Sequence, residues 1–209
     1  MNNFTITGFA DEIASDLDTQ IKGLKENSIA HIEVRGINGV NVSELTLDQV
    51  LTYKETLHEN GIKISSIGSP IGKISIEDPF EEHLALFKHV LDVAVAFESP
   101  YVRMFSFFIP EGKPADDFHE EVVKRWNQFL EVAKDYPQIT LLHENEKDIY
   151  GDIPERCAKL LTELNNPQVK AAFDPANFVQ CDVEVYPHAY ELLKDEIGYM
   201  HIKDAHFAD

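Results

Sequence analysis

The sequence predicts an α/β fold in which parallel strands alternate with helices and close into a barrel. Short β-rich runs alternate with helical patterns along the chain, at the period of roughly 30 residues that is typical of repeated β-α units. A doubly wound nucleotide-binding sheet would be expected to carry a glycine-rich turn after its first strand, whereas residues 8–12 read GFADE. We therefore favour a (β/α)₈ barrel.

The expected strands are short segments rich in β-branched or aromatic residues, which strands prefer. They cover residues 4–9, 31–36, 63–68, 101–107, 139–145, 169–174 and 198–204. These are seven strands, so the eighth strand of a closed barrel is missing from the sequence. We expect residues 1–209 to form a single barrel domain that is a truncated or incomplete version of a longer protein.

Between the expected strands, apolar residues recur at helical spacing and predict buried helix faces. The two clearest stripes are Leu84, Phe87, Leu91, Ala94 and Val95, and Phe118, Val122, Trp126, Phe129 and Ala133. Residues at the helix ends agree with this pattern, because Ser15 suits an N-cap, Asn60-Gly61 suits a helix end and Pro154 suits a first helical turn.

The charge of the chain excludes several classes of function. Its 18 Lys and Arg residues against 37 Asp and Glu give a net charge of −19, which repels phosphate backbones and anionic lipid surfaces. No apolar segment approaches the roughly 18 residues that a membrane span requires. The two cysteines, Cys157 and Cys181, show no metal-binding spacing. We expect a cytoplasmic protein that binds neither nucleic acid nor membrane, and a homo-oligomer stays open.

Ionisable residues recur near the carboxyl ends of the expected strands, where (β/α) barrels place their sites. They are Glu33, Arg35, Arg103, Glu144, Asp174, His201 and Lys203. Residues two apart in a strand share a face, so Glu144, Asp174 and His201 can all point into the barrel. Two buried carboxylates that face each other repel unless a cation lies between them. Two carboxylates and one imidazole suit Mn²⁺, Co²⁺, Zn²⁺ or Mg²⁺.

Each of these residues also has a structural interpretation. Glu33, Glu144 and Asp174 could be neutralised by Arg35, Arg103 and Lys203 in a lattice of ion pairs without any metal. His201 could be a core histidine, and Asp174, which precedes Pro175, could cap a turn. From the residues alone, the metal centre and the ion-pair lattice both stay open.

Three segments resemble the strand-end motifs of the xylose-isomerase-like barrel superfamily, and most closely its sugar phosphate isomerase/epimerase branch. They are LLHENEKDIYGD (141–152), FDPANFVQ (173–180) and YMHIKDA (199–205). Segments IEVRG (32–36), SPIGK (69–73) and YVRMFSF (101–107) extend the resemblance in order along nearly the whole chain. The resemblance implies a (β/α)₈ barrel with a divalent metal held by Glu144, Asp174 and His201.

The resemblance also implies a reaction, which is the isomerisation, epimerisation or dehydration of a small sugar, sugar phosphate or keto-polyol. The metal would stabilise an enediolate, and Glu144 would serve both as ligand and as acid/base. Many epimerases carry a histidine three residues after the metal aspartate, where this chain has Asn177. A fourth ligand, a glutamate on the eighth strand in that superfamily, would lie beyond Asp209.

Further residues are candidates for substrate binding. Glu33, Arg103 and Lys203 could contact the substrate or serve as counter-charges, and Asn177 could hydrogen-bond a hydroxyl group. Lys73, in the loop SPIGK, could contact the substrate from a lid. Alternatives to the isomerase or epimerase are a dehydratase that uses the same site and a non-catalytic sugar-binding barrel. The endonuclease branch of the superfamily is disfavoured by the charge.

Overall fold

The computed structural model describes residues 4–205, and their contacts group the chain into two compact units. Unit 1 comprises the chain up to Ser69 together with Lys88–Val102, and unit 2 comprises Pro70–Phe87 and the chain from Arg103 onward. Helix α3 (Glu81–Phe97) and strand β5 (Tyr101–Met104) each contribute residues to both units. The organisation of the chain as a single domain remains a prediction.

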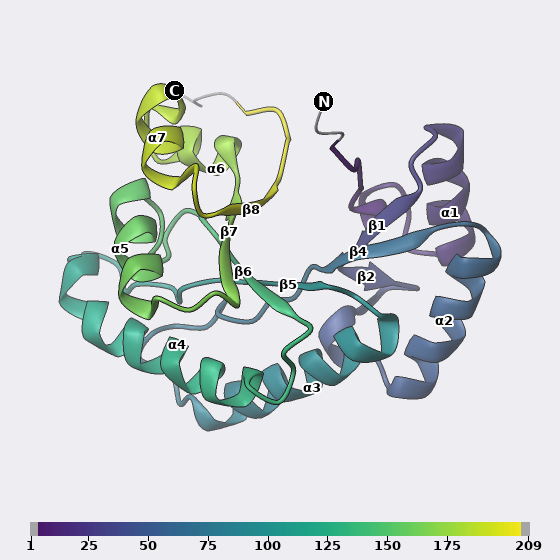
Figure 1. Cartoon of the computed structure of the whole chain (residues 1–209), viewed down its shortest axis with the longest axis horizontal. Helices are drawn as coiled ribbons and strands as arrows, with labels where there is room; N and C mark the ends of the chain where they lie inside the picture. Colours follow the sequence, from purple (N-terminus) through teal and green to yellow (C-terminus); the bar gives the residue numbers. More distant parts are fainter. Residues whose placement is uncertain (1–3, 206–209) are drawn as a thin grey trace. The chain divides into compact units, whose positions relative to one another are not determined.

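The main sheet has six strands in the order β1-β4-β5-β6-β7-β8 (Figure 1). Neighbours in the sheet therefore follow one another along the chain, apart from the short strands β2 and β3, which form a separate pair. The ladders β1–β4, β4–β5, β6–β7 and β7–β8 are parallel. Parallel neighbours joined by helices are the pattern that repeated β-α units produce.

In unit 1, β1 (His31–Val34) pairs with β4 (Lys63–Ile67). Helices α1 (Leu17–Glu26) and α2 (Leu47–Glu59) precede these two strands in the chain. A capping box between Thr46 and Gln49 begins α2, while Asn60 and then Gly61, with a φ of 75°, end it. Strands β2 (Gly36–Ile37) and β3 (Val40–Asn41) form a small antiparallel hairpin.

In unit 2, β6, β7 and β8 lie side by side, and helix α5 packs against β7 and α4 (Figure 1). The strands are β6 (Thr140–Glu144), β7 (Val169–Phe173) and β8 (Ile197–Met200). The helices are α4 (His119–Ala133), α5 (Pro154–Leu164), α6 (Pro175–Gln180) and α7 (Tyr190–Leu193). Pro154 and Pro175 occupy the first turns of α5 and α6, where a missing backbone N–H costs nothing.

The core of unit 2 is rich in aromatic rings. Phe129 on α4 contacts Phe80, Phe87 and Phe107 with ring centroids 4.7–6.0 Å apart. Trp126, also on α4, is fully buried and meets the ring of His143 edge to face at 5.6 Å. This contact ties α4 to β6, the strand that ends at Glu144. Aromatic pairs of this kind contribute about 0.5–1.5 kcal/mol beyond their buried area.

Several expectations on the local structure are wrong in detail. Residues 4–9 form no strand ladder, because the segment only makes an isolated bridge between Gly8 and Ile32. The N-cap of α1 is Asp16 rather than Ser15, with its side chain accepting a hydrogen bond from the Thr19 N–H at 2.8 Å. Val95 is 43% exposed and does not belong to the buried face of α3.

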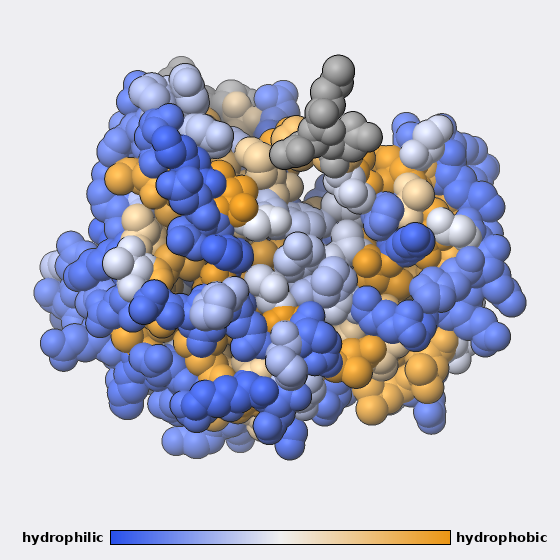
Figure 2. All heavy atoms as spheres, in the orientation of Figure 1, coloured by the Kyte–Doolittle hydropathy of each residue, from blue (hydrophilic) through white to orange (hydrophobic). Residues whose placement is uncertain are grey.

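Hydrophilic side chains cover most of the face of the molecule seen in Figure 2, in agreement with the high content of charged residues. Among the described residues, no helix is both long and apolar enough to cross a membrane. Both cysteines are free thiols, and Cys157 is buried.

Candidate metal centre at the ends of β6, β7 and β8

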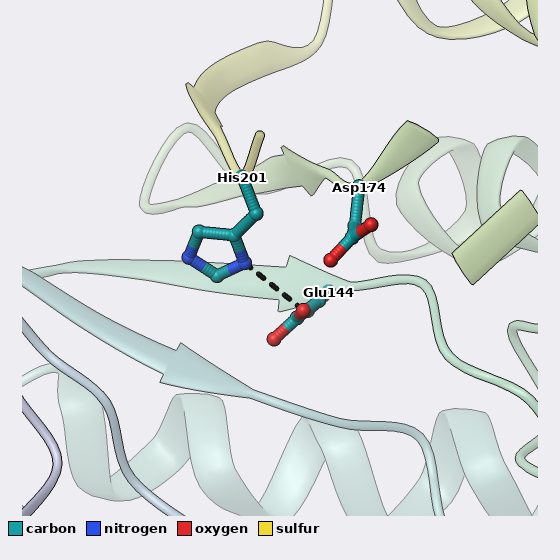
Figure 3. Close-up of side chains that lie close together, drawn as sticks. All are labelled: Glu144, Asp174 and His201. Atoms are coloured by element: carbon teal, nitrogen blue, oxygen red, sulfur yellow. Dashed lines mark hydrogen bonds and ion pairs between the residues drawn. The ribbon is translucent and has the colours of Figure 1, made fainter. Parts of the chain in front are cut away.

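Glu144, Asp174 and His201 lie at the carboxyl ends of three neighbouring strands. Glu144 is the last residue of β6, Asp174 directly follows β7, and His201 directly follows β8. In the parallel ladders Glu144 lies opposite Ala172 and Phe173 lies opposite Met200, and the His201 N–H donates to the carbonyl of Phe173 at 3.0 Å. The three side chains point toward one another in Figure 3. The structure thus brings together the three residues that the sequence predicts as metal ligands.

One ligand atom from each of the three side chains lies within 4.8 Å of the other two, and all three residues are buried. The imidazole Nδ1 of His201 lies 2.9 Å from Oε1 of Glu144. A divalent ion with nitrogen and oxygen ligands at about 2.0–2.2 Å separates its donors by no more than about 4.4 Å. Only small side-chain movements would therefore bring these donors around one ion.

The two carboxylate oxygens of Asp174 make different interactions. Its Oδ1 caps helix α6 by accepting a hydrogen bond from the Asn177 N–H at 2.9 Å. Its Oδ2 forms an ion pair with Lys203 Nζ at 2.8 Å. The interpretation of Asp174 as a cap is therefore correct for one oxygen, while the other faces the cation of Lys203.

Two cationic side chains accompany the two carboxylates. Arg103 Nη1 lies 3.3 Å from Glu144 Oε2, and Lys203 Nζ pairs with Asp174 as described above. Burial disfavours the charged form of Glu144, but Arg103 and the hydrogen bond to His201 outweigh it and lower the pKa of Glu144 to about 2. Glu144 is therefore ionised near neutral pH, the form that a metal ligand requires.

Two asparagines connect the carboxylates. The Asn145 side chain bonds to both backbone groups of Asp174, accepting from its N–H and donating to its carbonyl, each at 2.9 Å. The Asn177 Nδ2 donates to the Asn145 carbonyl at 2.8 Å and lies 3.4 Å from Glu144 Oε1. The Asn177 Oδ1 accepts from Lys203 Nζ at 2.9 Å. The sequence prediction did not include Asn145, although its position directly after a strand-end glutamate is a usable signal.

His143, the neighbour of Glu144, faces away from the cluster. Its Nε2 lies 2.9 Å from Ser106 Oγ, which also accepts the Gly151 N–H at 2.8 Å. Burial lowers the pKa of His143 to about 4, so the ring is neutral at physiological pH. The alternation of side chains along β6 predicts this opposite orientation of His143 and Glu144.

The loop that contains Lys73 is tied down by backbone hydrogen bonds. Phe105 and Phe107 donate to the carbonyls of Ile71 and Gly72 at 2.8 and 3.0 Å. Lys73 Nζ pairs with Glu146 at 2.8 Å and lies 4.4 Å from the centre of the Phe105 ring. Lys73 is thus half-buried against the loop after β6, and Glu146 is a second residue that the sequence prediction did not include.

Glu33 and Arg35 belong to unit 1. Glu33 lies on β1 and is buried, and its contact with a substrate remains a prediction. Arg35 pairs with Asp11 at 2.7 Å and with Glu12 at 3.1 Å. The ion-pair lattice foreseen from the sequence therefore exists in part, with Arg35 bound to other carboxylates than those expected.

The sequence of residues 25–209 matches the family model described as xylose isomerase-like TIM barrel, and the chain belongs to this family. No curated protein matches the chain by sequence.

Solved structures of similar fold agree with the family. The chain is similar to a probable 3-DHS dehydratase, AsbF, involved in petrobactin synthesis in Bacillus anthracis, with 19% identity, a TM-score of 0.75 and coverage of 96% of this chain and 73% of that one. It is also similar to D-psicose 3-epimerase with D-tagatose from Clostridium cellulolyticum H10, with 14% identity, a TM-score of 0.69 and coverage of 90% and 68%.

A third structure is a xylose isomerase-like TIM barrel protein from Mycobacterium smegmatis in complex with magnesium. Its identity to the chain is 19%, its TM-score is 0.69, and the similarity covers 93% of this chain and 68% of that one. At these identities the three structures support the fold.

Proposed function

We propose that the chain is a metal-dependent isomerase or epimerase that acts on a small sugar, sugar phosphate or keto-polyol. The observation that carries this proposal is the convergence of Glu144, Asp174 and His201 at the ends of three neighbouring strands, with donor atoms within 4.8 Å. Membership of the family, the sugar epimerase of similar fold and the magnesium complex of another family member support it.

The ion-pair lattice is the main alternative for this cluster. Arg103 and Lys203 balance the charge of the two carboxylates, but they do not account for the third side chain. An imidazole and two carboxylates that converge in a buried position form a donor set suited to a divalent metal. Glu144 Oε2 and Asp174 Oδ2 are buried, and the partners that the structure gives them are the cations of Arg103 and Lys203, so both oxygens are placed where a positive charge is favourable.

The chemistry of the site would be proton transfer at a carbon next to a carbonyl group. A divalent metal, when bound, would supply Lewis acidity that makes this carbon-bound proton more acidic and stabilises the enediolate. Glu144 is the proposed acid/base on one face of the substrate, because its carboxylate lies beside the atoms that would hold the metal and is ionised, as proton abstraction requires. Lys203 and Arg103 would hold substrate oxygens, and burial of the cluster would exclude water.

Asn177 and Lys73 are further proposed contacts of the substrate. Asn177 is buried next to Lys203, and its amide could bond to a hydroxyl group after a small rearrangement. Lys73 retains a side-chain exposure of 32% beside Glu146 and could reach a polar substituent. A substrate panel would identify the sugar and its phosphorylation state. Loading with Mn²⁺, Co²⁺, Zn²⁺ and Mg²⁺ in turn would identify the metal.

The test combines metal analysis with an assay of carbon–hydrogen exchange. The purified protein is loaded with each of the four metals and incubated in deuterated water with a panel of ketoses, polyols and their phosphates. We expect metal-dependent deuterium uptake into one substrate class, and its loss in Glu144→Gln. Glu196→Gln, which removes the partner of Lys170, is the control and should exchange normally. Full exchange by Glu144→Gln would refute the role of this residue.

A dehydratase that uses the same site is the second candidate, and the similarity of fold to a probable dehydratase favours it. Loss of water from a keto-polyol gives an absorbing enone, so ultraviolet absorption during turnover would distinguish the two reactions. A sugar-dependent rise in melting temperature, without exchange or enone formation, would instead support a non-catalytic sugar-binding barrel.

A further inference from the structure

The side chain of Asn145 extends the pairing of β6 and β7 beyond the end of the backbone ladder. The described ladder ends with Glu144 opposite Ala172 and does not include Asp174. Asn145 bridges this gap, because its Oδ1 accepts the Asp174 N–H and its Nδ2 donates to the Asp174 carbonyl, both at 2.9 Å. A side-chain amide thus takes the place that a backbone peptide group has in a ladder.

Asn145 is also connected to the side chain of Asp174 through hydrogen bonds of Asn177. The Asn145 carbonyl accepts the Asn177 Nδ2 at 2.8 Å, and the Asn177 N–H donates to Asp174 Oδ1 at 2.9 Å. Backbone and carboxylate of Asp174 are therefore both connected to Asn145. Because Asn145 directly follows Glu144 in the chain, these bonds set the spacing between the two carboxylates.

A direct contact between Asn145 and substrate is disfavoured by the same geometry. The residue is only 2% exposed, and both polar atoms of its side chain are engaged by the Asp174 backbone. Breaking these bonds would leave two buried backbone groups without partners, each at a cost of about 1–3 kcal/mol. The amide is therefore held by its structural partners.

We propose that Asn145 is a positioning residue that holds Asp174 at the distance from Glu144 that a shared divalent metal requires. The inference rests on the proposed metal centre and adds a determinant of its metal affinity. Groups that orient metal ligands in this way typically change metal affinity by about 10- to 100-fold when they are removed. We expect an effect of this size for Asn145, although it does not touch the metal itself.

Gln168, directly before β7, offers a matched control. It precedes β7, whereas Asp174 follows it, and its Nε2 donates to the carbonyls of Ala133 and Tyr136 at 3.1 and 2.9 Å. Gln168→Ala thus removes two hydrogen bonds between a side-chain amide and the backbone, as Asn145→Ala does. The bonds of Gln168 lie at the start of β7, whereas those of Asn145 lie at its end. If Asn145 only stabilised the fold, Asn145→Ala and Gln168→Ala would bind metal with the same affinity.

The experiment titrates the full chain with Co²⁺ and follows visible absorption, which reports both the dissociation constant and the coordination of the ion. Thermal unfolding without metal is measured in parallel. We expect Asn145→Ala to weaken Co²⁺ binding by about 10- to 100-fold and to alter its spectrum. Gln168→Ala should lower the melting temperature and leave binding and spectrum unchanged.

Asn145→Gln is a milder variant for the case in which Asn145→Ala does not fold. It keeps an amide in the buried position, but the additional methylene displaces the two polar atoms, so Co²⁺ binding should again weaken. Binding within twofold of wild type in a folded Asn145 variant would overturn the inference. Equal weakening in Gln168→Ala would overturn it as well.

The outcomes separate this inference from the proposed function. If the wild type does not bind Co²⁺, both the metal centre and the role of Asn145 are refuted. If the wild type binds Co²⁺ and the Asn145 variants bind it weakly, the inference holds even when no sugar is turned over. In that case only the proposed reaction fails.

Discussion

The two carboxylate oxygens of Asp174 have different partners in the structure. One oxygen caps α6, and the other faces Lys203 next to Glu144 and His201. An asparagine at this position could still cap the helix, because asparagine and aspartate are equally good N-caps. It would, however, bring no negative charge to the cluster.

We therefore expect Asp174→Asn to weaken binding of a divalent metal at least about tenfold while the protein remains folded. Isothermal titration with Mn²⁺ or Zn²⁺ measures the first effect, and far-ultraviolet circular dichroism measures the second. Asp16→Asn is the control, since Asp16 caps α1 through the same type of bond to Thr19. Equal metal affinity of wild type and Asp174→Asn would contradict the assignment of this ligand.

His83 is a buried histidine whose Nε2 accepts the Gly72 N–H at 2.7 Å. Burial, aided by the charge of Arg125, lowers the pKa of His83 from 6.5 to about 4. Between these values the unfolded chain binds a proton that the folded protein does not. Stability from this residue is therefore complete above pH 6.5 and declines as the pH falls toward 4, by at most about 1.4 kcal/mol per pH unit.

Urea unfolding of the wild type and of His83→Gln at several pH values between 4 and 7 measures this effect. A glutamine can accept the same hydrogen bond without titrating, so the variant should lose part of the pH dependence. An identical slope in both proteins would show that His83 does not titrate as stated.

The sequence predicted which side chains converge at the strand ends better than it predicted their surroundings. Glu144, Asp174 and His201 were predictable because strand ends, side-chain alternation and family motifs all select them. Asn145 was not, since its role depends on the exact offset between two strands, which the sequence of either strand does not contain. Likewise, Arg35 was expected near the strand-end glutamates but pairs with Asp11 and Glu12.

At the scale of elements, the loop after β4 shows how closely two backbones approach. Gly72 has a φ of 90°, and a Cβ at this residue would lie 2.2 Å from the carbonyl oxygen of Phe105. We expect Gly72→Ala to destabilise the protein by at least about 3 kcal/mol, because steric overlap adds to the unfavourable φ.

Gly112 provides the comparison for this prediction. Its φ is 74°, but a Cβ would meet no atom within 4 Å. Gly112→Ala should therefore cost only the backbone strain, about 1–2 kcal/mol. The free energies of unfolding from denaturant titration test the difference, and equal losses in both variants would argue against the close approach at Gly72.

Most elements of the main sheet were predictable, since their apolar runs and flanking turns are strong signals. The segment at residues 4–9 has the composition of a strand, yet it only forms an isolated bridge at Gly8. Strand formation there depends on hydrogen-bonding partners and not on composition alone. The hairpin of β2 and β3 was overlooked, although Asn38-Gly39 at its turn is a typical hairpin signal, with φ values of 54° and 77°.

At the scale of the whole molecule, the net charge of −19 bears on possible partners. A duplex with an abasic site would be repelled by this charge, since binding to phosphates depends on cationic side chains. We expect no retardation of such DNA by the protein in a gel at about 50 mM salt, and no strand cleavage with any of the four metals. Specific cleavage at the abasic site would instead support an endonuclease.

Trp126 is the only tryptophan of the chain, and it is fully buried against His143, the residue before Glu144. Excitation at the red edge of the tryptophan absorption band therefore gives fluorescence from this one indole. Its surroundings include β6, the strand that ends at Glu144. Its emission maximum and lifetime provide an optical reporter without any label. Changes at β6 on addition of a metal or a sugar can thus be followed in real time in the unmodified protein.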